Sequence, residues 1–212
     1  MKSDNFSHLK DKYKEIWDSY VNHKFVNELR EGTLSKESFK YYLIQDSKYV
    51  KEMMKALARA AGNSIDDKVN TFLMKILSSK DRGREVHEKL IKSIGITETE
   101  IEDSRFSLVN FAYTRHLLLS SRTWEEFVFA WTPCMVGYYE IGNIAKDTKI
   151  ELYREWASFY ASAEYGERVK LIIDELNSIK LNDYLESLFQ NSVILETLFW
   201  DSALKMDPTL FR

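Results

Sequence analysis

The sequence predicts an all-α protein, and three observations support this prediction. Apolar residues recur at helical spacing along most of the 212 residues. The chain contains only seven glycines and two prolines, which is few for a fold built from many strands and turns. No sustained alternation of apolar and polar residues indicates a strand. We therefore expect one helical-bundle domain over residues 1–212, long enough to bury a substantial core.

The helical pattern divides the chain into consecutive segments. The expected helices span residues 4–30, 35–62, 65–93, 98–121, 124–145, 149–163, 167–178 and 182–205. Gly32, Gly62 and Gly95 punctuate the ends of the first three segments, because glycine accepts the positive φ that often ends a helix. The next three segments begin with a hydroxyl residue followed three positions later by glutamate, which is the pattern of a capping box. These pairs are Thr97 with Glu100, Thr123 with Glu126, and Thr148 with Glu151.

Composition excludes several classes of protein. A net charge of −3 gives no electrostatic reason to expect a nucleic-acid partner. One cysteine cannot form an internal disulfide, so a secreted protein stabilised by disulfides is not expected. The N-terminal residues carry frequent charges and no apolar signal core, and no run approaches the ~18 apolar residues that span a bilayer. We therefore expect a cytoplasmic protein with no membrane partner.

Two of the expected helices bury an acid. In the segment 35–62, Asp46 lies among Phe39, Tyr42, Tyr49 and Met53 on one helical face. In the segment 182–205, Glu196 interrupts a stripe made of Phe189, Val193, Trp200 and Ala203, with Phe199 beside it. A buried ion pair or hydrogen bond would explain either residue. Buried acids also concentrate at functional sites, and an apolar pocket raises the pKa of a carboxyl so that it can donate a proton near neutral pH.

The single cysteine lies in the stretch WTPCMVGYYE, residues 131–140. Trp131, Cys134 and Tyr138 share one helical face, and Pro133 should bend the helix or loosen its hydrogen bonds. A free cysteine is commonly a buried core residue. A thiol close to two carboxyls and aromatic rings would instead suit covalent catalysis on a flat heterocycle.

The histidines do not indicate a metal site. His8, His23, His87 and His116 are scattered, and none completes the Glu-x-x-His motif of di-iron bundles. No Cys/His cluster has zinc spacing, so we expect no metal. A Cys–His pair could form only across space, and His23 and His116 are expected to cap helices or fill the core.

Several strings, in order along the chain, resemble the TenA or thiaminase II family. They are HKFVNELREGTLSKESFKYYLIQDSKYV, FAYTRHL, PCMVGYYEIG, YREWASFYAS and ILETLFWDSA. The resemblance implies a haem-oxygenase-like helical fold without haem, no cofactor, and a homotetramer. It also implies an aminopyrimidine aminohydrolase that releases 4-amino-5-hydroxymethyl-2-methylpyrimidine from thiamin or from its aminomethylpyrimidine breakdown product, for thiamin salvage.

The resemblance also implies roles for individual residues. Cys134 matches the family's nucleophile, Glu196 its proton donor, and Asp46 the carboxylate that holds the aminopyrimidine. The remaining pocket residues implied by the match are Tyr49, Tyr113, Tyr138, Tyr160 and Phe199. Two alternatives stay open: a haem-binding or haem-degrading protein of the same fold, with His8 or His23 as axial ligand, and a non-catalytic interaction protein with an unreactive thiol.

Overall fold

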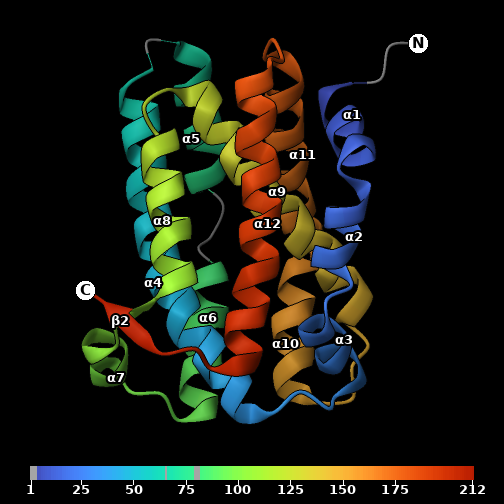
Figure 1. Cartoon of the computed structure of the whole chain (residues 1–212), viewed down its shortest axis with the longest axis vertical. Helices are drawn as coiled ribbons and strands as arrows, with labels where there is room; N and C mark the ends of the chain where they lie inside the picture. The colour runs from blue at the N-terminus through green and yellow to red at the C-terminus, as the bar shows by residue number, and fades with distance from the viewer. Residues whose placement is uncertain (1–3, 65, 79–81) are drawn as a thin grey trace.

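The computed structural model describes residues 4–64, 66–78 and 82–212, and its architecture is almost entirely helical (Figure 1). In chain order the elements are α1 (Asn5–Lys12), α2 (Lys14–Val21), α3 (Lys24–Glu31), α4 (Lys36–Gly62), α5 (Asp67–Ser78), α6 (Arg82–Ile94), α7 (Glu98–Asp103), β1 (Phe106–Ser107), α8 (Leu108–Ser120), α9 (Trp124–Ala145), α10 (Glu151–Tyr160), α11 (Ala163–Ser178), α12 (Asp183–Lys205) and β2 (Thr209–Phe211). The prediction of an all-α fold is confirmed.

Helix α9 is the central element of the bundle. It packs against α12, α10, α11 and α8, and α12 runs in front of it in Figure 1. Nearly every residue from Trp124 to Tyr138 is buried, because the sequence of this helix is apolar on all sides. The helix continues through Pro133, whose ring supplies no N–H for the carbonyl of Phe129. Most of the side chains on α9 are therefore part of the core.

The segment 4–30 was expected to be one helix, and this prediction is wrong. The chain leaves helical geometry at Tyr13 and again at Asn22, which gives α1, α2 and α3. His23 caps α3 by accepting a hydrogen bond from the amide of Phe25 at its Nδ1. The first break separates partners, because α1 lies on α11, whereas α2 and α3 both lie on α12 and α9.

The segment 98–121 is also interrupted, where one continuous helix was expected. Thr97 and Glu100 form the predicted capping box of α7, but α7 ends at Asp103. The short strand β1 follows and pairs antiparallel with β2 near the C-terminus, with Phe106 opposite Phe211. Ser107 then caps α8 by accepting a hydrogen bond from the amide of Asn110. Contacts with a strand remote in sequence therefore override local helical periodicity here.

The remaining boundaries need smaller corrections. Helix α11 begins at Ala163, four residues before the expected start, because Ser162 caps it. Thr148 does not cap α10: its hydroxyl donates to the carbonyl of Leu29 at 2.9 Å, and α10 begins after Ile150. The expected helix 65–93 corresponds to α5 and α6, and its residues 65 and 79–81 lie outside the described residues.

Candidate active site

The long helices bring the predicted site residues to one place in the core. Asp46 and Tyr49 come from α4, Tyr113 from α8, Cys134 and Tyr138 from α9, Tyr160 from the end of α10, and Glu196 and Phe199 from α12. The hydroxyl of Tyr113 donates to Oε1 of Glu196 at 2.7 Å. The Cys134 thiol also lies within hydrogen-bonding reach of Glu196. The charge of Asp46 acts on both Glu196 and Cys134, so the two acids and the thiol lie close together although they are remote in sequence.

Glu196 is held in its protonated form. It is 2 % exposed, and this burial raises the pKa of its carboxyl to about 8 from an ordinary value of 4.5. Hydrogen bonds from Tyr113 and Cys134 oppose the shift, and the negative charge of Asp46 adds to it. Desolvation outweighs the two hydrogen bonds, so Glu196 carries a proton at neutral pH and can donate it.

The Cys134 thiol is also held neutral. Burial, followed by the nearby charge of Glu196, raises the pKa of the thiol well above its ordinary value. The nearby hydroxyl of Tyr49 acts on this pKa in the opposite direction but does not outweigh burial. The residue as a whole is partly buried rather than completely enclosed. The thiol needs a proton acceptor at the moment it attacks, and the adjacent carboxyl group of Glu196 is in place for this.

The hydroxyl of Tyr49 is free to form a hydrogen bond. Its ring packs 4.9 Å from Tyr113 and 6.2 Å from Phe199, measured between ring centroids. The residue is 5 % exposed, yet within the described part of the chain no partner meets its oxygen with good hydrogen-bonding geometry. A buried hydroxyl without a partner is costly. This oxygen can therefore serve the thiolate of Cys134 or a bound ligand.

A second group of packed aromatic rings contains Tyr138 and Tyr160. Tyr138 and Tyr160 are 4.9 Å apart between centroids, and both also pack on Trp156. The Tyr42 hydroxyl lies 3.5 Å from that of Tyr138 and accepts from Trp156 Nε1 at 3.2 Å. Faces of this kind suit a flat ring of ligand-like size. Tyr42 was seen in the sequence only as part of an apolar stripe, because its hydroxyl bonds cannot be inferred from spacing.

His87 lies beside the predicted site, although no sequence pattern indicated it. It lies on α6 with its Nε2 3.5 Å from Oδ2 of Asp46. Of the other histidines, His116 bonds the hydroxyl of Ser192 at 2.9 Å. Both ring nitrogens of His23 have partners, the amide of Phe25 and the carboxylate of Asp201. No group of three or more potential metal ligands occurs among the described residues.

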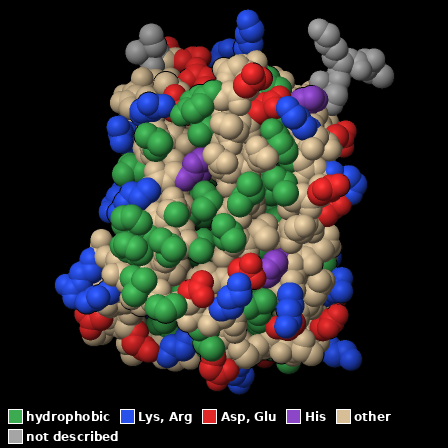
Figure 2. All heavy atoms as spheres, in the orientation of Figure 1, with side chains coloured by type: hydrophobic (Ala, Val, Ile, Leu, Met, Phe, Trp, Pro, Cys, Tyr) green, Lys and Arg blue, Asp and Glu red, His purple; other side chains and the backbone are tan. Residues whose placement is uncertain are grey.

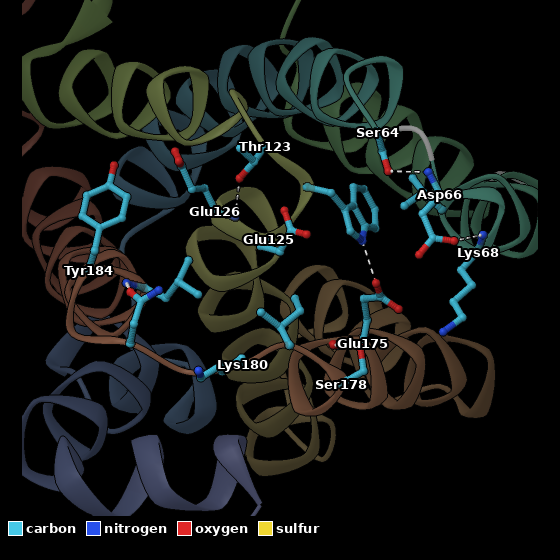
Figure 3. A pocket seen from close by; sticks show the side chains of 15 residues that line it. Ser64, Asp66, Lys68, Thr123, Glu125, Glu126, Glu175, Ser178, Lys180 and Tyr184 are labelled. Atoms are coloured by element: carbon cyan, nitrogen blue, oxygen red, sulfur yellow. Dashed lines mark hydrogen bonds between the residues drawn. The ribbon is translucent and has the colours of Figure 1, made fainter.

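A separate cleft of about 540 Å³ opens near the start of α9 (Figure 3). Its polar groups bond one another: Trp124 Nε1 donates to Glu175 at 2.7 Å, and Thr123 accepts from the amide of Glu126. Acids and lysines are mixed along its walls. Cys134 lies ten residues after Trp124 on α9, about 15 Å away at the rise of an α-helix, and does not line this cleft.

Comparisons with known proteins establish the family. The model of the TENA/THI-4/PQQC family matches residues 10–206, which is most of the chain. The chain belongs to this family. The "Aminopyrimidine aminohydrolase" of Halalkalibacterium halodurans is 29 % identical over 209 residues, covering 92 % of this chain and 93 % of that protein.

Solved structures agree with this assignment. A TenA-like protein from Sulfolobus solfataricus superimposes with a TM-score of 0.93 at 40 % identity, covering 99 % of this TENA-family chain and all of the other. A domain from Shewanella denitrificans, described as having a heme oxygenase-like fold, gives a TM-score of 0.74 at 16 % identity over 95 % of this chain and 93 % of that one. The fold is therefore the expected haem-oxygenase-like bundle. No helix among the described residues has both the length and the apolar character to cross a membrane.

Proposed function

We propose that this TENA-family chain is a thiamin-salvage hydrolase. Its substrates would be 4-amino-5-aminomethyl-2-methylpyrimidine, thiamin, or both, and its product 4-amino-5-hydroxymethyl-2-methylpyrimidine. The observation that carries the proposal is the cluster of a thiol, a protonated glutamate and a second buried carboxyl, Cys134, Glu196 and Asp46. The name of the Halalkalibacterium halodurans relative supports the substrate class.

Binding would use the aromatic walls and Asp46. The pyrimidine would lie among the rings of Tyr49, Tyr138, Tyr160 and Phe199, which are within about 5–6 Å of their neighbours. The Asp46 carboxylate would accept a hydrogen bond from the exocyclic amine. Because an ionised acceptor makes a stronger bond than a neutral one, this contact would orient the ring.

Covalent addition of Cys134 to the pyrimidine ring would allow the leaving group to be expelled. The Glu196 carboxyl donates its proton to a ring nitrogen, the thiol proton passes to Glu196, and a carbon–sulfur bond forms at the adjacent ring carbon. The C=N bond of the ring becomes single in this step. The electron pair on the ring then expels ammonia from the protonated aminomethyl group, or neutral thiazole from the thiazolium of thiamin, and leaves an exocyclic methylene. Water adds to this methylene and releases one proton to solvent. The carbon–sulfur bond then breaks, and the proton on the ring nitrogen returns to the sulfur of Cys134.

The test is direct hydrolysis by the purified chain. Thiamin and the aminomethylpyrimidine are incubated separately with the protein, and hydroxymethylpyrimidine is followed by chromatography. We expect release from at least one of them, with one equivalent of ammonia or thiazole. Absence of product from both substrates, with protein that is folded by circular dichroism, overturns the proposal.

We also propose that the chain assembles as a homotetramer, as the family resemblance implies. Figure 2 shows hydrophobic side chains gathered over α8 and α12. The exposed large apolar residues of these helices are Leu108, Leu119, Ile194 and Leu198, which are between 39 % and 61 % exposed. A contiguous apolar surface of this kind on a soluble protein is typical of an interface.

A further inference from the structure

Helix α6 packs against α10 and α4 and carries His87 beside Asp46. Lys89 on this helix pairs with Glu155 of α10. A Cβ atom on Gly83 would lie 3.0 Å from Cζ of Phe159, so the backbone of α6 approaches α10 closely. His87 faces α4 from this support, and its side chain is one-quarter exposed.

The ring nitrogen of His87 that faces α4 must act as a donor. Nε2 lies 3.5 Å from Oδ2 of Asp46 and 3.5 Å from Oγ of Ser47. The Ser47 hydroxyl already donates to the carbonyl of Leu43 at 2.7 Å, so toward His87 it can only accept. Both neighbours of Nε2 are therefore acceptors, and Nε2 carries a proton. Because both contacts use one nitrogen, the three residues do not form a Ser–His–Asp relay.

Asp46 has little other electrostatic support. Its residue is 5 % exposed, and a carboxylate with so little water needs donors around it. Within the described part of the chain, His87 is the basic side chain that comes within 4 Å of it. The contact engages Oδ2 and leaves Oδ1 for another donor. At 3.5 Å it is longer than a well-formed hydrogen bond, and such contacts commonly tighten when a ligand binds.

We propose that His87 is a positioning residue that holds Oδ2 of Asp46, so that Oδ1 faces the exocyclic amine of the aminopyrimidine. This inference rests on the proposed function. Without the His87 donor, the Asp46 side chain would be free to rotate and would present its oxygens to the amine less often. The loss would fall mainly on binding rather than on the chemical step at Cys134.

The test compares three variants of the full chain. His87→Leu removes the donor, whereas His87→Gln keeps an amide N–H near the place of Nε2. His8→Leu is the matched control, because His8 contacts Glu186 at the same 3.5 Å on the outside of the bundle. KM and kcat are measured for aminomethylpyrimidine hydrolysis, and Kd for hydroxymethylpyrimidine by calorimetry. We expect His87→Leu to raise KM and Kd by about tenfold to a hundredfold with a smaller change in kcat. The Gln and His8 variants should stay within about threefold of the parent.

A double variant shows whether His87 acts by positioning Asp46 or only by packing in the core. If His87 acts through Asp46, adding His87→Leu to Asp46→Asn should change Kd little beyond the effect of Asp46→Asn alone. Unchanged Kd in His87→Leu, or additive losses in the double variant, overturn the inference while the parent still hydrolyses its substrate. If His87→Leu does not fold, His87→Gln and His87→Asn replace it, since Asn cannot reach the place of Nε2 and should bind weakly. A parent that neither binds nor hydrolyses the pyrimidine overturns the proposed function itself.

Discussion

Cys134 and Glu196 illustrate how burial sets the chemistry of single residues. Each is a weak acid whose pKa is raised, so both keep their protons in the resting protein. Two neutral acids in contact avoid the desolvation cost of a thiolate beside the negative charge of Asp46. The reactive pair would then form only as the proton of Glu196 leaves for the substrate. Cys134 would thus remain a neutral thiol in the resting protein and would become a thiolate only during the reaction.

Cys134→Ser should abolish turnover, by about a thousandfold or more, while folding and product binding stay near those of the parent. Serine fits the volume of cysteine, but its hydroxyl is a far weaker nucleophile at the same place. The measurements are the initial rate of hydroxymethylpyrimidine release and calorimetric binding of that product. Near-parental turnover in a preparation free of other hydrolases would show that the thiol is only a core residue.

Glu196 should make activity depend on pH. If its protonated form is the donor, kcat/KM should fall as pH rises through about 8, the pKa of this carboxyl in the ligand-free protein. Glu196→Gln should lose most activity at every pH, since an amide cannot deliver the proton. The rate is measured from pH 6 to about 10 with ionic strength held constant. A flat profile across this range would contradict the assignment of Glu196 as donor.

The same carboxyl should also couple stability to pH. The folded chain keeps the Glu196 proton up to about pH 8, whereas an ordinary glutamate releases it near pH 4.5. The contribution of this group to stability is therefore fully present below about pH 4.5 and is lost as pH rises toward 8, by up to roughly 1.4 kcal/mol per pH unit. Comparing urea unfolding of the parent and of Glu196→Gln across this window should show a weaker decline in the variant.

At the scale of elements, the contact between α2 and α9 depends on a glycine. A Cβ atom on Gly137 would lie 2.1 Å from Cε1 of Tyr20 and 2.4 Å from its hydroxyl oxygen. Tyr20 is fully buried, so its ring has no room to retreat. The tyrosine therefore fills the space that a side chain at position 137 would occupy. Helical periodicity alone could not show this, because it treats α2 and α9 as independent.

Gly137→Ala should destabilise the chain by roughly 1–3 kcal/mol, the usual cost of overpacking a core. Gly62→Ala is the matched control at the end of α4, where nothing lies within 4 Å of the new Cβ, and it should be neutral or slightly stabilising. Both are measured by reversible urea unfolding. Adding Tyr20→Leu to Gly137→Ala should recover part of the loss; equal stability of the two alanine variants would contradict the close contact.

At the scale of the whole molecule, the apolar surface on α8 and α12 has a testable consequence. Light scattering at micromolar concentration should give a mass near four times the 25.0 kDa chain. Leu119→Glu together with Leu198→Glu should lower that mass, because burying two charges in an interface is costly. Met74→Glu, at an exposed position on α5, is the control and should leave assembly unchanged. A parent that is monomeric under these conditions would refute the assembly.

The sequence by itself determined the helical class, most of the long helices and the unusual residues on their buried faces. Asp46, Cys134 and Glu196 stand out there because periodicity is local: it places a residue on a face from its near neighbours alone. Only the tertiary structure decided that α1, α2 and α3 are separate, that β1 interrupts the segment 98–121, and that His87 meets Asp46. Those outcomes depend on groups from other helices, whose distances cannot be inferred from one chain segment.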